Sequence, residues 1–115
     1  PALSAGADLL APITPYFVMK LGHVPVLPYH RPGDPAVADE VRRTITRHAE
    51  QGKRLRAVML SRLGPNVWHH SPAAAMAVLE ELEETAKLWL LSNPKPTPLG
   101  AEQIDELRRS FGAQW

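Results

Sequence analysis

Histidine is the residue type in this chain that most often binds metal ions in proteins. The five histidines are His23, His30, His48, His69 and His70. No pair has the His-x-His spacing and no His-Glu-x-x-His motif occurs, so no local segment predicts a metal site. His69 and His70 are adjacent, and neighbouring side chains of a strand point to opposite faces. We interpret the histidines as ordinary loop or strand-end residues.

The two tyrosines, Tyr16 and Tyr29, are a second candidate for chemistry. A tyrosine hydroxyl can donate a proton to a group on which negative charge develops during a reaction. A packed ring with a hydrogen-bonded hydroxyl accounts for the same residues. The sequence leaves both interpretations open and favours the packing role.

Charged residues form two runs. The basic run comprises Arg42, Arg43, Arg47, Lys53, Arg54 and Arg56, and the acidic run comprises Glu80, Glu81, Glu83 and Glu84. The basic run could contact phosphate, but an exposed helix and its following loop explain it as well, and the acidic run fits the solvated side of a helix. Thirteen Lys and Arg against twelve Asp and Glu give a net charge of +1. We therefore expect neither nucleic acid nor a membrane as a partner.

Composition excludes several kinds of site. The absence of cysteine excludes a disulfide framework, a thiolate zinc site, an iron–sulfur cluster and a cysteine nucleophile. No apolar run approaches the roughly 18 residues of a membrane-spanning helix, and no signal segment opens the chain. These features predict a soluble, cytoplasmic protein. At 115 residues the chain is large enough for one modest core.

Pairs of capping residue and proline mark where the predicted helices begin. Asp34-Pro35 and Ser71-Pro72 each place a capping side chain before a proline at the first helical position. Apolar residues at helical spacing predict helices over about 35–51, 72–92 and 101–111. The 72–92 helix carries an apolar stripe of Ala75, Leu79, Leu82, Ala86, Trp89 and Leu90, and the 101–111 helix carries Ile104, Leu107 and Phe111.

Short strands are predicted between these helices. The 24–29 segment is rich in Val and Leu but contains two prolines, which restrict any strand there to an edge. Residues 56–61 predict a buried strand, followed by a Gly64-Pro65 turn and a short strand over 66–68. The run over 16–21 is too short to distinguish helix from strand, and residues 1–15 read as a connecting segment. The order of elements predicts an α/β fold with few strands.

Three segments resemble the C-terminal half of the class II aldolase/adducin family, closest to its branch of 3-oxo-tetronate 4-phosphate decarboxylases. The segments read ITPYFVMKLG, VPVLPYHRPGDPAVADEV and EELEETAKLWLL, and the similarity extends over roughly residues 9–111. The resemblance implies a partial three-layer α/β/α domain with a small mixed, mainly antiparallel sheet and three helices. We expect residues 1–115 to form this single, partial domain, whose family members are usually tetramers with active sites at subunit interfaces.

The resemblance also implies a site. Family members hold a divalent metal, usually zinc, with three histidines, and the metal acts as a Lewis acid in carbon–carbon cleavage of phosphorylated sugar acids or ketoses. Tyr16 falls where aldolase members keep a tyrosine regarded as a proton donor. The AVMLSRLGPNVW segment matches a strand and an Asn-His-Gly-Pro turn whose histidine is the third metal ligand, and Leu63 occupies that place. The His-x-His pair, the acid/base glutamate and most phosphate contacts belong to the other half of the family pattern.

Three hypotheses follow from this match. The first is a lyase segment of the decarboxylase type, truncated or degenerate, that binds no metal and is inactive alone because Leu63 has no lone pair to donate. The non-Met first residue agrees with a piece of a longer chain. The second is a non-catalytic, adducin-like assembly module. The third is one subunit of a split enzyme, completed by another polypeptide. We expect a homo-oligomer or association with a missing N-terminal half, and the assembly module predicts self-association or a protein partner without metal dependence.

Overall fold

A short mixed sheet lies at the centre of the computed structural model, which describes residues 7–115. Strand β1 (Val26–Leu27) pairs in parallel with β2 (Ala57–Leu60), and β2 pairs antiparallel with β3 (Gly64–Val67), in the order β1-β2-β3. Most of the paired residues are antiparallel, as expected. The expectation for residues 1–6, as part of a connecting segment, lies outside the described residues.

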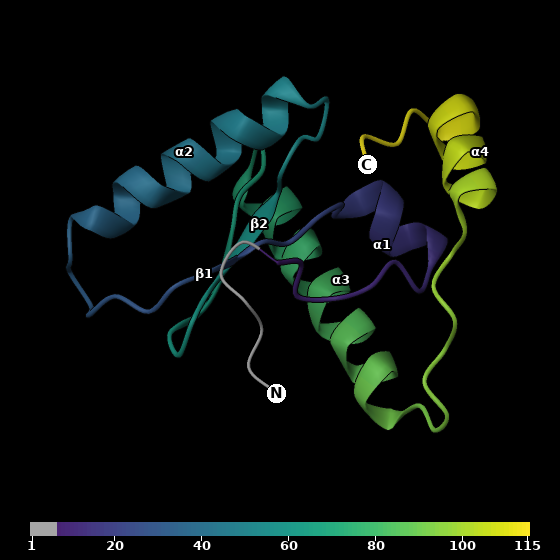
Figure 1. The fold of residues 1–115 in the computed structure, drawn as a ribbon, viewed down its shortest axis with the longest axis horizontal. Helices are drawn as coiled ribbons and strands as arrows, with labels where there is room; N and C mark the ends of the chain where they lie inside the picture. The colour runs from purple at the N-terminus through teal and green to yellow at the C-terminus, as the bar shows by residue number, and fades with distance from the viewer. Residues whose placement is uncertain (1–6) are drawn as a thin grey trace.

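Four helices surround this sheet within the described residues (Figure 1). They are α1 (Pro15–Lys20), α2 (Ala36–Glu50), α3 (Pro72–Leu91) and α4 (Ala101–Phe111). The three predicted helices are confirmed, and their ends differ from the expected ones by at most one residue. The ambiguous run over 16–21 forms the fourth helix, so the expected count of three helices is one too few. No described helix is long and apolar enough to cross a membrane.

Local capping explains where α1 and α3 begin. The Ser71 hydroxyl accepts a hydrogen bond from the Ala74 N–H at 3.1 Å. Thr14 does the same for the Phe17 N–H at 3.0 Å, with Pro15 in the first helical position. Both caps satisfy an N–H group that would otherwise lack a partner at the start of a helix. Thr14-Pro15 is thus the same pair of capping residue and proline that marks the other predicted helices. The helix was not predicted because the run that follows is too short to show a helical period.

The turn between β2 and β3 lies earlier than the sequence suggested. Gly64 and Pro65 belong to β3, and the reversal is made by residues 61–63. Proline is tolerated in β3 because this strand lies at an edge of the sheet, where the missing N–H removes no bond to β2. Arg62 carries the turn with a φ of 64°, which is left-handed backbone.

We expect Arg62→Asn to raise the free energy of unfolding by about 0.5–1 kcal/mol, because asparagine adopts left-handed backbone at lower cost than arginine. Urea unfolding followed by circular dichroism measures the change. Arg43→Asn is the matched control, and we expect it to lower stability slightly since asparagine is a weaker helix former than arginine. Equal effects of the two substitutions would contradict the assignment of strain to Arg62.

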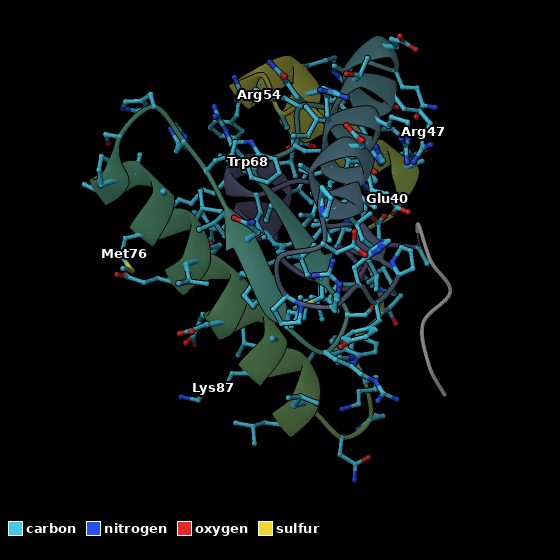
Figure 2. All side chains as sticks on the ribbon, turned by 90° about the vertical axis from the view of Figure 1, so that its left-hand side faces the viewer. Glu40, Arg47, Arg54, Trp68, Met76 and Lys87 are labelled. Atoms are coloured by element: carbon cyan, nitrogen blue, oxygen red, sulfur yellow. The ribbon has the colours of Figure 1, made fainter. Side chains whose placement is uncertain are left out.

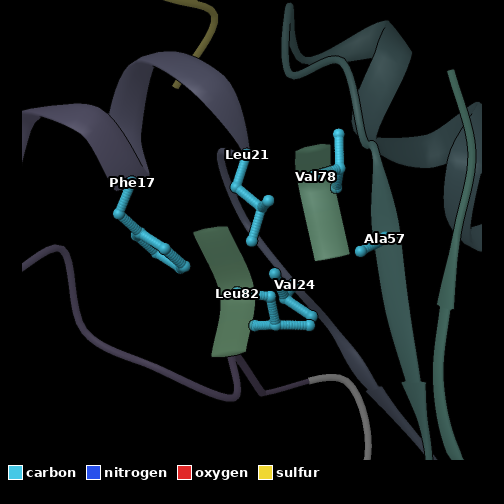
Figure 3. Packing of buried hydrophobic residues seen from close by; sticks show 6 residues of the cluster. All are labelled: Phe17, Leu21, Val24, Ala57, Val78 and Leu82. Carbon is cyan, nitrogen blue, oxygen red and sulfur yellow. The ribbon is translucent and has the colours of Figure 1, made fainter. Parts of the chain in front are cut away.

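Side chains from the two faces of the sheet enter two separate cores. On one face Ala57 packs with Phe17 and Leu21, around α1 and α3. Figure 3 shows this cluster, with Val24, Val78 and Leu82 completing it. On the other face Val58 packs with Leu27 and Leu55, against Val41 and Ile45 of α2. The sheet is therefore covered by α2 on one face and by α1 and α3 on the other, which is the predicted three-layer α/β/α arrangement.

The apolar stripes of α3 and α4 are only partly buried. In α3 the fully buried positions are Val78, Leu82 and Thr85, whereas Leu90 is 74% exposed. In α4, Ile104 and Leu107 are buried and Phe111 is exposed. For α4 the predicted stripe is right except for Phe111. For α3 it is wrong in part, because only Leu82 of the predicted stripe is buried and the covered face is shifted to Val78 and Thr85.

Candidate functional site

A groove runs between α2 and the β2–β3 hairpin. Its volume is about 670 Å³ and its walls are mainly apolar. Val37 and Val41 of α2 face Leu60 and Leu63 of the hairpin across it. Its polar side chains are Arg31, Asp34, Arg42, Thr46 and Asn66. A mainly apolar hollow with a few polar side chains is the usual form of a small-molecule site.

Leu63 lies at the end of the turn that follows β2. Its N–H donates a hydrogen bond to the Leu60 carbonyl at 3.0 Å, and its side chain is 46% exposed in the groove. A side chain at this position is therefore open to solvent and to anything bound in the groove. An imidazole here would have room to reach a ligand, whereas the isobutyl group of leucine offers only apolar contact.

Tyr16 lies in a different layer. It occupies the first turn of α1, is 60% exposed, and its ring centroid is 5.4 Å from the Lys20 Nζ. It is not among the residues that line the groove, which is on the α2 side of the sheet. Tyr29, also exposed, does not line the groove either. The structure therefore does not bring Tyr16 and Leu63 together within one chain.

A second hollow, which we call the basic pocket, lies on the α1 and α3 side. It has a volume of about 410 Å³ and carries five basic side chains: Lys20, Arg54, Arg56, His69 and His70. The basic run of the sequence is thus divided by the fold. Arg42 stays on α2 and pairs with Asp39 at 2.6 Å, as the solvated-surface interpretation predicted. Arg54 and Arg56 instead join residues that are distant in the sequence.

Two basic side chains of the basic pocket have lowered pKa values. Burial lowers the pKa of His69, and the positive charges of Arg56, His70 and Arg54 lower it further. Burial and the neighbouring Arg54 likewise lower the pKa of Arg56. Both shifts have the sign expected where like charges gather.

We expect Arg56→Gln to raise the pKa of His69 toward its ordinary value of 6.5, because the substitution removes one of the neighbouring charges that lower it. Since the folded protein holds the His69 proton less tightly than the unfolded chain, this histidine should reduce stability as the pH falls through about 6.5. NMR titration of the histidine ring protons measures the pKa. Arg43→Gln, which removes a charge from α2, should leave it unchanged. The idea fails if both variants give the same His69 titration as the parent chain.

A carboxylate–histidine pair that the sequence did not indicate joins Asp8 to His23. The Asp8 Oδ2 lies 2.7 Å from the His23 Nδ1, and the His23 ring stacks on Trp115 with 3.8 Å between centroids. His48 is similarly occupied, with its Nδ1 2.8 Å from the Thr44 carbonyl. These contacts hold the imidazoles in packed surroundings. Asp8 and His23 are 15 residues apart, so no short spacing motif could have revealed this pair.

Comparison with known proteins decides the family. Residues 2–90 match the family described as Class II Aldolase and Adducin N-terminal domain. The chain belongs to the class II aldolase/adducin family. Two relatives carry the name 3-oxo-tetronate 4-phosphate decarboxylase: one from Cupriavidus necator is 50% identical over 94% of this chain, and one from Pectobacterium atrosepticum is 42% identical over 87%. The chain spans about half the length of these relatives, 49% and 43% respectively.

Solved structures agree with this assignment. A crystal structure of YgbL from Escherichia coli, described as a candidate aldolase/epimerase/decarboxylase, superposes with a TM-score of 0.73 and 39% identity. The superposition covers 90% of this chain and 47% of that structure. The class II aldolase-like fold predicted for the chain is therefore confirmed over most of its length.

Class II aldolases generally depend on a divalent metal, so the residues present were compared with such a site. Across residues 7–115, no three side chains from His, Cys, Asp and Glu gather in a group that could hold an ion. The nearest approach is His30, whose Nδ1 lies 3.4 Å from Asp34 and whose Nε2 lies 3.4 Å from Glu40. Because the two ring nitrogens point in different directions, these carboxylates cannot share one ion with it. The described residues do not fit a three-ligand metal site.

Proposed function

We propose that this class II aldolase-like chain is a segment of a carbon–carbon lyase of the decarboxylase type that acts on a phosphorylated sugar acid. The names of its relatives carry the proposal, since those with 40–50% identity are 3-oxo-tetronate 4-phosphate decarboxylases. The chain matches only about half of the length of each of these relatives. The remaining half is where the resemblance places the other metal ligands and most phosphate contacts.

In this proposal the chain is inactive by itself. Leu63 stands at the position of a metal-binding histidine, and the described residues offer no substitute group of three donors. Zinc is the metal we expect for the complete site, because histidine-rich sites in this family suit it. A site without one of its three protein ligands would hold the ion weakly.

Tyr16 supplies the proton in this scheme. Loss of carbon dioxide from a 3-oxo acid leaves an electron pair on the adjacent carbon, and a proton must replace the departing carboxylate. The exposed Tyr16 lies on the face of the sheet opposite Leu63, so it would serve a site completed by a second chain. This separation supports a homo-oligomer or association with the missing half. We place the assembly in the cytoplasm.

The test is a decarboxylation assay on the purified chain with 3-oxo-tetronate 4-phosphate, run with added zinc and with added manganese. We expect no turnover and less than one equivalent of bound metal. Adding the half of the Cupriavidus necator relative that this chain does not match tests the split-subunit arrangement, and turnover that appears only in the mixture would support it. If the chain alone bound one equivalent of metal and turned over the substrate, the proposal that it is inactive by itself would be wrong.

A non-catalytic, adducin-like assembly module is the second candidate. Large apolar side chains on α3 support it, because Met76, Leu88, Leu90 and Leu91 are all exposed. An assembly role predicts self-association that is insensitive to a metal chelator. Sedimentation of the chain with and without EDTA measures this, and a Leu90→Glu/Leu91→Glu variant should dissociate. A parent chain that sediments as a monomer at every concentration would exclude the module.

A further inference from the structure

The basic pocket concentrates positive charge that the described chain does not neutralise. Its five basic side chains come from α1, from the segment around the start of β2, and from the loop before α3. No Asp or Glu lines it. Arg42 and Arg108 pair with carboxylates. Among residues 7–115, by contrast, Lys20, Arg54 and Arg56 have no carboxylate within ion-pair distance. The pocket therefore lacks an internal counterion among the described residues.

Folding brings these like charges together from distant parts of the sequence. Gathered like charges repel one another, and in a chain with a net charge of only +1 the cluster is not the result of general basicity. Figure 2 shows Arg54 and Trp68 at the same end of the sheet, away from Arg47 on α2. Arg54 and Arg56 also border a neighbouring hollow with Lys53 and Trp68, so the positive charge gathers at this end of the sheet.

The donors of the basic pocket suit a compact anion. The His70 backbone N–H donates to the His69 Nδ1 at 2.8 Å, which leaves the His69 Nε2–H as a donor in the neutral ring. Arg54 and Arg56 each offer a planar guanidinium fork that matches the oxygens of phosphate. The pocket also includes Ala74 in the first turn of the 20-residue α3, whose dipole is positive at this end, while the Ala74 N–H itself is bonded to the Ser71 hydroxyl.

We propose that the basic pocket binds the phosphate group of a small phosphate monoester, or phosphate itself. The pocket is open to solvent, and its volume of about 410 Å³ admits a small metabolite, whereas a nucleic acid would need an extended basic surface. Lys20, which lines the pocket, also places its Nζ 5.4 Å from the centre of the Tyr16 ring, although Tyr16 itself does not line the pocket. The pocket lies on the opposite face of the sheet from Leu63.

The test is an NMR titration of the full chain with inorganic phosphate, with sulfate and with glycerol 3-phosphate, at constant ionic strength maintained with chloride. We expect saturable shifts centred on the backbone amides of residues 54–56 and 69–74, together with a rise in the pKa of His69. Tighter binding of glycerol 3-phosphate than of inorganic phosphate would identify a monoester as the ligand, and the reverse order would identify free phosphate.

A double variant, Arg54→Gln/Arg56→Gln, should weaken phosphate binding at least about tenfold, since hydrogen bonds to charged groups are among the strongest in proteins. Arg43→Gln/Arg47→Gln removes the same charge from exposed positions of α2 and should change the affinity less than twofold. Equal weakening by both pairs, or no saturable shift in the parent chain, would overturn the proposal. Should the double pocket variant fail to fold, the single variant Lys20→Gln tests the pocket instead, and it should also weaken phosphate binding. The position of the shifted amides in the parent chain gives a second, independent test. The titration involves no lyase assay, so its outcome is independent of the proposed function.

Discussion

Phe17→Ala should lower the free energy of unfolding by about 3–5 kcal/mol, the range found when a buried aromatic side chain is removed from a core. Phe17 is fully buried, packs with Leu21 and Val24 in the cluster beneath α1, and meets Trp115 edge-to-face at 6.3 Å between centroids. Its loss would leave a cavity between α1, α3 and the sheet. Urea unfolding followed by tryptophan fluorescence measures the change.

Phe111→Ala is the control for this prediction, because the chain has only two phenylalanines and Phe111 is 66% exposed at the end of α4. We expect it to change stability by less than about 0.5 kcal/mol, as is usual for surface positions. Similar losses from the two substitutions would mean that α1 does not pack against the sheet as described.

Leu63→His should restore metal-dependent turnover when the chain is combined with the half of the Cupriavidus necator relative that it does not match. A metal ion acting as a Lewis acid contributes several kcal/mol to transition-state stabilisation, so we expect turnover to rise at least about 10²-fold over the same mixture with Leu63. Because Leu63 is 46% exposed in the groove, the substitution should cost little stability. Decarboxylation rate and bound zinc, measured on the same sample, test it.

Two controls separate the ligand from other effects of the substitution. Leu63→Gln introduces polarity without an imidazole and should leave turnover unchanged. Leu91→His introduces an imidazole at an exposed position of α3, outside the groove, and should also have no effect. A gain with either control, or none with Leu63→His, would contradict the role given to this position.

Features with local causes were predictable from the sequence. The Ser71-Pro72 pair begins α3 as predicted, whereas α2 begins one residue later than predicted, because Pro35 is its N-cap residue and not its first helical residue. At α2 the Asp34 carboxylate accepts from the Ala36 N–H at 3.0 Å, although the helix itself begins at Ala36. By contrast, the exposure of Leu90 could not be predicted, since an apolar stripe does not reveal which part of it is covered.

The candidate site was less accessible from sequence. Tyr16 and Tyr29 were candidates from their chemistry, but only the family resemblance pointed to Tyr16 in particular and to Leu63. No local pattern states that Tyr16 and Leu63 occupy opposite faces of the sheet. The basic pocket could not be predicted because Lys20, Arg54 and His69 are brought together by tertiary packing of three separate segments. Sequence spacing describes ligands on one helix or strand, and this cluster has no such spacing.

Pro65 has a consequence for how copies of this chain can meet. The Met59 N–H donates to the Pro25 carbonyl on the β1 side, so the ladder position opposite it, Pro65, directs its nitrogen away from β2 and toward the outer edge of β3. That nitrogen carries no hydrogen. An incoming strand would therefore leave one of its own carbonyls without a donor, which disfavours amyloid-like growth from this side. Edge-to-edge pairing of two copies through β3 is disfavoured for the same reason.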